Sequence, residues 1–149
     1  MAFHFTLNGV LRLRESLEQA ELQRLQFIAG AVALAHAEVE SVENDIHSAR
    51  RRTFDAVAAA GLTGAELHFE MEREAALNAL RSQLLKKRAD LEQKRKEQQA
   101  RYVQARMQRE ILSNLYERQL ADYELDQSRR AQQRIDELFL IRRASSATK

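Results

Sequence analysis

The side chains that most often carry catalysis or bind metals are few and scattered in this sequence. The four histidines, His4, His36, His47 and His68, share no motif. Glu43 and His47 have the i, i+4 spacing that places two ligands on one face of a helix, but a stable metal site needs three or four ligands. We therefore predict that the chain has no catalytic site and no metal site.

The glycines and carboxylates also give no sign of an active site. Gly61 and Gly64 lie close together, yet a phosphate-binding loop needs a lysine after its glycines and a strand before them. The many Asp and Glu residues alternate with Lys and Arg at helical spacing, which favours surface ion pairs. We expect a protein that is not an enzyme, requires no cofactor, and functions through what its surfaces bind.

One interruption, Gly61-Leu62-Thr63-Gly64, divides a proline-free sequence that is otherwise typical of helix from about residue 8 to about residue 141. Gly61 can adopt the left-handed conformation that ends a helix, and Leu62 can pack back onto that helix. Thr63 and Glu66 have the spacing of a capping box at the start of the next helix. Because so short a connection makes two helices neighbours, the sequence predicts an antiparallel hairpin.

The predicted fold class is therefore all-α, a long antiparallel two-helix coiled-coil hairpin that forms a single domain. We expect the first helix at about 8–60, the turn at 61–63, the second helix at about 64–141 and a short polar tail at 142–149. Composition agrees, since 31% of the residues are charged and only 6% are aromatic, which is typical of coiled coils.

The same composition bears on location. The chain has no cysteine, its N-terminus lacks the basic and apolar regions of a secretory signal, and no apolar run approaches the roughly 20 residues of a membrane span. We expect a soluble protein of the cytoplasm that does not cross the membrane.

A heptad stripe runs along the first helix and marks its face toward the second. Its members from residue 25 onward are Leu25, Ile28, Val32, Ala35, Val39, Val42, Ile46 and Ala49. An earlier stripe of Val10, Leu13, Leu17 and Ala20 follows the same rhythm, so a slip in register is expected between Ala20 and Leu25. The second helix has a weaker stripe of Leu67, Leu77, Leu80, Leu84 and Leu91, then Leu112, Tyr116 and Tyr123.

Residues 81–109 form a basic strip, with ten Lys and Arg residues against three acidic ones, although the net charge of the chain is only +2. Such a strip attracts nucleic acid through its phosphates. The strip has one aromatic residue, Tyr102, and no known nucleic-acid-binding motif, so a solvated helix face is favoured and no specific nucleic-acid binding is expected.

Pairing the helices about a turn near residue 62 places the charge-free stretch Leu25–Ala37 opposite the charged middle of the second helix. Two interpretations stay open: Lys and Arg stems cover this stretch, or Phe27, Ala31 and Leu34 form a docking surface for another protein. The same pairing leaves the second helix without an intramolecular partner beyond about residue 116. Its apolar end, Leu138 to Ile141, favours docking into a partner.

The motifs at both ends resemble those of the flagellar export protein FliJ family. The first is Phe3-x-Phe5-x-Leu7-x-x-Val10-Leu11-x-Leu13-Arg14-Glu15. The second is Leu112-x-x-Leu115-x-Glu117-Arg118, followed by Tyr123-Glu124, Arg129 and Gln133-x-x-Asp136-Glu137. The resemblance covers nearly the whole chain.

The resemblance implies a non-enzymatic component of the flagellar type III export apparatus, an antiparallel coiled coil similar to the stalk of rotary ATPases. Such a stalk inserts into the hexameric export ATPase, promotes its assembly and activity, and contacts the cytoplasmic domain of the membrane export gate. It would be cytoplasmic and peripherally associated with the inner membrane through the apparatus, with export chaperones as further partners.

The resemblance also assigns residues to each partner. The ATPase ring would contact Phe3, Phe5, Leu7, Leu11, Leu138, Phe139 and Ile141, and the export gate would contact Val42, Ile46, Phe69 and Leu80. Three alternatives to a flagellar stalk stay open: the equivalent stalk of a virulence secretion system, a hairpin chaperone or adaptor for export substrates, and a nucleic-acid-binding coiled coil.

Overall fold

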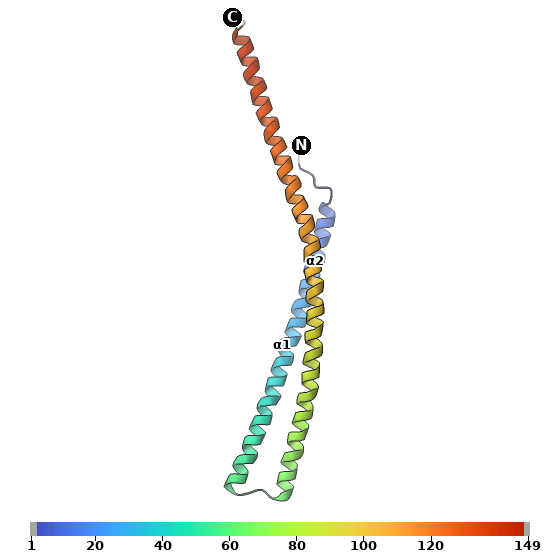
Figure 1. Ribbon diagram of the computed structural model, residues 1–149, viewed down its shortest axis with the longest axis vertical. Helices are drawn as coiled ribbons and strands as arrows, with labels where there is room; N and C mark the ends of the chain where they lie inside the picture. Colours follow the sequence, from blue (N-terminus) through green and yellow to red (C-terminus); the bar gives the residue numbers. More distant parts are fainter. Residues whose placement is uncertain (1–2, 148–149) are drawn as a thin grey trace. The chain divides into compact units, whose positions relative to one another are not determined.

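Two long helices make up the protein. The computed structural model describes residues 3–147, with side chains to residue 144. Helix α1 spans Asn8–Ala59 and helix α2 spans Gly64–Ala147, and the two pack antiparallel as a hairpin (Figure 1). The predicted all-α hairpin with a longer second helix is confirmed. The chain divides into two compact units, unit 1 with Met1–Glu18 and Gln104–Lys149, and unit 2 with Gln19–Val103.

The reversal between the helices has the predicted chemistry. Gly61 has a φ of 77°, a left-handed conformation in which residues with a Cβ are disfavoured, and its N–H donates to the Val57 carbonyl oxygen at 3.3 Å. The capping box is closed in both directions: the Thr63 N–H donates to Glu66 Oε2 at 2.8 Å, and the Glu66 N–H donates to Thr63 Oγ1 at 3.3 Å. These bonds satisfy groups that a helix end leaves without partners, and they hold the pKa of the Glu66 carboxyl below its usual value.

In unit 2 the predicted stripe of α1 is the core. Val32, Ala35, Val39, Val42, Ile46 and Ala49 are buried, and Leu25 and Ile28 are half-buried. Ion pairs along one side of this core fix the register: Glu43 pairs with Arg81 at 2.8 Å and Arg50 with Glu74 at 2.6 Å. These are the partners that a turn centred near residue 62 requires, so the expected pairing of the helices is confirmed.

In unit 1 the expected stripe of α1 is wrong. Val10, Leu13 and Leu17 are exposed, and the residues that face α2 are instead Leu7, Leu11, Arg14 and Glu18. These four residues and the buried stripe of unit 2 follow one unbroken heptad pattern. The slip in register expected between Ala20 and Leu25 is therefore absent from α1. Polar residues can hold seam positions here because α2 supplies partners for them: Arg14 donates to Gln108 at 2.5 Å, and Arg109 donates to Glu18 at 2.7 Å.

Polar residues also occupy the face of α2 that meets α1. In unit 2, Arg81 lies on this face and pairs with α1, whereas the neighbouring Leu80 is exposed. Leu67 is exposed as well. Gln98 is buried, and its Nε2 donates to both the side chain and the backbone carbonyl of Glu21. A stripe counted from apolar residues alone therefore misplaces Leu67 and Leu80.

The overhang of α2, its part with no partner in α1 or the N-terminal segment, begins further along the sequence than about residue 116. The helix also ends further along the sequence than the expected residue 141. Residues 3–7, before α1, lie along α2, so that Phe3 contacts Tyr123. A non-helical segment covers about 3.3 Å of length per residue against about 1.5 Å in a helix, so a few residues cover two further turns of α2. Side chains from Ser128 to Ala144 are then all exposed. The helix continues through residues 142–147, since no glycine or proline stops it; residues 148–149 of the expected polar tail lie outside the described part.

Among the described residues, α1 is long and apolar enough to cross a membrane by length and composition alone. Its most apolar 18-residue window has a mean hydropathy of 1.2. The expectation that no segment is long and apolar enough to cross a membrane is therefore not met by α1 on these two criteria. A single helix of this kind is weak support for a membrane span, because helices that pack inside proteins pass the same test. Val32, Ala35 and Val39 of α1 are buried in the hairpin seam.

We expect the turn to tolerate alanine at one glycine and not at the other. Gly61→Ala should destabilise the hairpin by about 1 kcal/mol, because it forces a Cβ into a left-handed conformation. Gly64→Ala is the matched control; an added Cβ there meets no atom within 4 Å and its φ is not positive, so it should leave the melting temperature unchanged or raised.

Thr63→Ala should also cost about 1 kcal/mol, and Thr63→Ser should retain the cap. Thermal unfolding followed by circular dichroism measures all four variants. Equal melting of Gly61→Ala and the parent would contradict the role given to the left-handed residue.

Candidate functional site

The last turns of α2 expose a cluster of large apolar side chains, which we call the C-terminal patch: Ile135, Leu138, Phe139 and Ile141. Leu138 and Phe139 are 66% and 65% exposed, although large apolar side chains are normally buried. Ile135, Leu138, Phe139 and Arg142 have the i, i+3, i+4, i+7 spacing of one helix face, and with Ile141 they line a shallow groove. Such a surface suits burial against another macromolecule.

The N-terminal segment forms an aromatic clamp on α2. The Phe5 ring lies 5.3 Å from the Tyr116 ring, and the Phe3 ring lies 5.6 Å from both Tyr116 and Tyr123. The Phe3–Tyr116 and Phe5–Tyr116 pairs are edge-to-face, and Phe3–Tyr123 is tilted. Edge-to-face rings at these distances attract one another in addition to the apolar area that they bury. Phe5 is only 4% exposed. Of the residues that the sequence analysis assigned to the ATPase, Phe5 and Leu11 are thus engaged within the hairpin, whereas the C-terminal patch is exposed.

An ion pair holds the same unit together beside this clamp. Arg109 Nε donates to Glu18 Oε2 at 2.7 Å, and both side chains are largely shielded from solvent. The hydrogen bond from Arg109 holds the pKa of the Glu18 carboxyl below its usual value, and Glu18 in turn raises the pKa of Arg109. Sequence reasoning missed both the clamp and this pair. The two tyrosines seven residues apart, opposite two phenylalanines, were the available signal for the clamp.

The residues assigned to the export gate divide into two classes. Val42 and Ile46 are buried in the seam of unit 2, so their side chains support the hairpin. Phe69 is 63% exposed and, with Leu62, lines a shallow apolar groove beside the turn, while Leu80 is partly exposed. The structure therefore brings Phe69 next to the turn and leaves Leu80 outside the seam.

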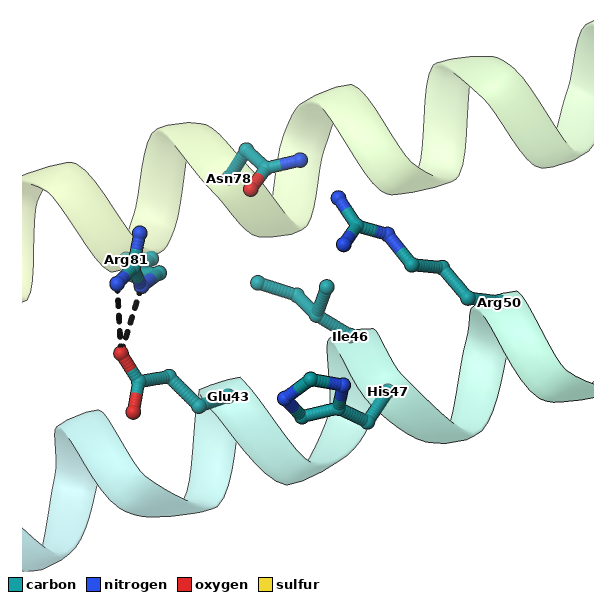
Figure 2. A pocket seen from close by; sticks show the side chains of 6 residues that line it. All are labelled: Glu43, Ile46, His47, Arg50, Asn78 and Arg81. Carbon is teal, nitrogen blue, oxygen red and sulfur yellow. Dashed lines mark hydrogen bonds and ion pairs between the residues drawn. The ribbon is translucent and has the colours of Figure 1, made fainter.

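A polar gap lies between the helices of unit 2 (Figure 2). Its lining residues are Glu43, Ile46, His47 and Arg50 of α1 with Asn78 and Arg81 of α2. Arg81 donates through Nε and Nη2 to the same oxygen of Glu43, so this carboxylate is engaged by a cation beside His47. Within the described residues no three His, Cys, Asp or Glu side chains gather as a metal site would require.

Part of the basic strip is neutralised inside the molecule. Four of its cations form ion pairs with carboxylates: Arg81 with Glu43, Lys87 with Glu38, Arg106 with Glu110, and Arg109 with Glu18. The pairs of Arg81, Lys87 and Arg109 join α2 to α1 and so hold the hairpin in register, whereas Arg106–Glu110 lies within α2. The three pairs between the helices give the strip a structural role.

Sequence comparison identifies the family. The chain matches the family described as Flagellar FliJ protein over residues 3–148. The chain belongs to the FliJ family. No curated protein and no solved structure matches it significantly. FliJ proteins are components of the flagellar export apparatus, so the resemblance seen in the sequence motifs is confirmed and this chain is a component of that apparatus.

We expect the Glu18–Arg109 pair to make the stability of this FliJ protein depend on pH. Because the folded state favours the ionised Glu18, the pair stabilises the fold above the ordinary carboxyl pKa of 4.5, and this contribution is lost as the pH falls through the lowered pKa. Glu18→Gln should therefore lower the melting temperature at neutral pH, and the difference from the parent should shrink in acid. Glu124→Gln, at an exposed position of α2, is the control and should melt like the parent at every pH. A difference that persists unchanged in acid would contradict the assignment.

Proposed function

We propose that this chain is the stalk of the flagellar type III export apparatus, a non-enzymatic cytoplasmic protein that inserts into the hexameric export ATPase and promotes its assembly and activity. The observation that carries the proposal is the exposed C-terminal patch on the overhanging end of α2. A lone helix is only marginally stable in water, and burial of its apolar face in a partner would stabilise it.

The dimensions of the overhang fit insertion into a ring. A single α-helix with its side chains is about 10–12 Å across, which is narrow enough for the central opening of a protein ring. Because one asymmetric helix cannot satisfy six equivalent sites at once, we expect one stalk per hexamer. The aromatic clamp and the Glu18–Arg109 pair would then brace the base of the inserted helix, with Phe3, Phe5, Leu7 and Leu11 contributing through α2.

We propose further that the surface beside the turn contacts the cytoplasmic domain of the export gate. Phe69 and Leu80 are the accessible members of the assigned set, and Val42 and Ile46 are buried in the seam that holds α1 against α2. This contact would associate the protein peripherally with the inner membrane, and export chaperones would be further partners of the same assembly.

Changing the C-terminal patch should abolish stimulation of the ATPase without unfolding the hairpin. Leu138→Ser combined with Phe139→Ser removes two apolar anchors that make little contact within the chain, and loss of such anchors weakens an interface by at least about tenfold. ATP hydrolysis by the export ATPase, measured with and without this protein, is the readout, and thermal unfolding checks the fold.

The matched control for the patch is Met107→Ser combined with Ile111→Ser, two exposed apolar residues on the same helix outside the patch. This variant should stimulate the ATPase normally. Deletion of residues 138–149 should act like the patch variant. Normal stimulation by either the patch variant or the deletion would refute docking through the patch.

For the gate, Phe69→Ala should weaken binding to the purified cytoplasmic domain of the gate by about tenfold and leave melting unchanged, because the side chain is exposed. Phe54→Ala removes a similarly exposed ring from α1 and should bind normally. Ile46→Ala should lower the melting temperature, since it leaves a gap in the seam. If Phe69→Ala binds the gate domain like the parent, the assignment of the gate surface is wrong.

A further inference from the structure

The last large apolar residues of α2 point to every side of the helix. Leu138, Phe139, Leu140 and Ile141 follow one another in the sequence, and each is between 62% and 66% exposed. Successive residues of an α-helix are rotated by about 100°, so four in a row cover the whole circumference. Elsewhere in α2, large apolar residues occur only singly or in pairs. We call these four residues the apolar girdle.

Leu140 distinguishes the apolar girdle from the C-terminal patch. Ile135, Leu138 and Phe139 share one side of the helix, as steps of three and four residues require, and they line the shallow groove together with Ile141. Leu140 projects from the other side of the helix and does not line that groove. A partner that covered one face would therefore leave Leu140 in water. A helix that is apolar all round is instead a helix that is enclosed.

The shape of the girdle distinguishes between kinds of partner. Four residues rise about 6 Å along a helix, whereas the hydrocarbon core of a membrane is about 30 Å thick, so the girdle does not match a membrane span. A helix that lies in the membrane interface buries one face only. A single helix or a flat surface of another protein also covers one side. The lumen of a protein ring approaches an inserted helix from every side.

The charges beside the girdle indicate what else the enclosing surface carries. From Ser128 to Ala144 the overhang has five arginines against Asp136 and Glu137, although the net charge of the whole chain is only +2. Arg134 and Arg130 lie one and two turns before the girdle, on one side of the helix. Among the residues whose side chains the structure describes, neither of these two arginines has an ion-pair partner. Their charges are therefore available to carboxylates of another protein.

We infer that the apolar girdle sits inside a closed apolar collar of its partner, and that carboxylates of the same partner line the approach to this collar and pair with Arg130 and Arg134. The inference rests on the proposed insertion into the export ATPase, and it adds the chemistry of the surface that receives α2. Enclosure buries all four residues of the girdle, whereas docking through the C-terminal patch alone would leave Leu140 exposed.

Because the chain has no cysteine, each position of the girdle is open to a single thiol probe. The variants are Leu138→Cys, Phe139→Cys, Leu140→Cys and Ile141→Cys, each labelled with a maleimide in the presence and absence of the hexameric export ATPase. With the ATPase at about ten times its dissociation constant for each variant, labelling should slow by about tenfold at all four positions. Phe54→Cys, at an exposed position of α1, is the control and should be labelled at the same rate in both conditions.

The pattern of protection separates failure of the collar from failure of the proposed function. If only Leu140→Cys keeps its full reactivity, the collar is wrong and docking through the C-terminal patch stands. If none of the four variants is protected, both the collar and the proposed insertion are wrong. Protection by vesicles of anionic lipid, or by an excess of this chain itself, in place of the ATPase would also overturn the inference, because a membrane or a second copy would then be the occupant.

Substitution of Leu140 tests the collar through affinity. Leu140→Ser should weaken binding to the ATPase by at least about tenfold, since an apolar anchor is lost from a closed interface. Ile111→Ser removes a similarly exposed apolar residue of α2 and should bind normally. Thermal unfolding should be the same for both variants and the parent. Normal binding by Leu140→Ser would contradict enclosure of the girdle.

Charge reversal tests the carboxylates assigned to the partner. Arg130→Glu combined with Arg134→Glu should weaken binding to the ATPase by at least about tenfold at low salt, and the difference from the parent should shrink as the salt concentration rises. Arg51→Glu combined with Arg52→Glu makes the same change in net charge at exposed positions of α1 and should bind like the parent. Equal binding by the two double variants would overturn the assignment of carboxylates to the approach.

Discussion

The left-handed residue at the turn determines which residue of α1 meets which residue of α2. Gly61 ends α1, and the capping box of Thr63 and Glu66 starts α2 three residues later. Because the connection has no slack, every later contact follows from it. The Arg50–Glu74 and Glu43–Arg81 pairs in unit 2 and the Glu18–Arg109 pair in unit 1 lie where this reversal puts them. A longer loop would have allowed the helices to slide by a heptad, since much of the seam is polar.

Two helices alone cannot enclose a core, and the energetics of the protein reflect this. Among the described residues no large side chain is fully buried, and the buried set is mostly small or β-branched residues of α1. The seam is completed by polar contacts, such as Gln98 with Glu21, which are favourable only in the correct register because buried polar groups need partners. Stability is therefore distributed along the helices, and substitutions in one part of the seam act locally.

The same thin architecture explains why the candidate sites are surfaces. A hairpin has no deep cavity in which to assemble catalytic groups, but it exposes most of the area of each helix. The C-terminal patch, Phe69 of α2, and Phe27 and Leu34 of α1 are all apolar and exposed on helices whose other faces are charged. Phe27, Leu34 and Phe69 lie on helix that is packed in the hairpin, so the backbone that presents them is fixed before a partner binds, which lowers the ordering entropy of association. The overhang that carries the C-terminal patch instead gains stability as a helix when a partner covers it.

The sequence alone determined the hairpin, its turn and the seam of unit 2, because these depend on local chemistry: glycine at a positive φ, a capping box and an uninterrupted apolar heptad. It also supplied the terminal motifs of the FliJ family and the apolar end of α2. Only the tertiary structure decided that Leu11, Arg14 and Glu18, rather than Val10, Leu13 and Leu17, face α2. The reason is that a polar side chain on a seam is stable only when the other helix supplies its partner, and Gln108 and Arg109 lie more than ninety residues away along the chain. The clamp of Phe5 on Tyr116 depends in the same way on a contact between distant residues, which periodicity within one helix cannot reveal.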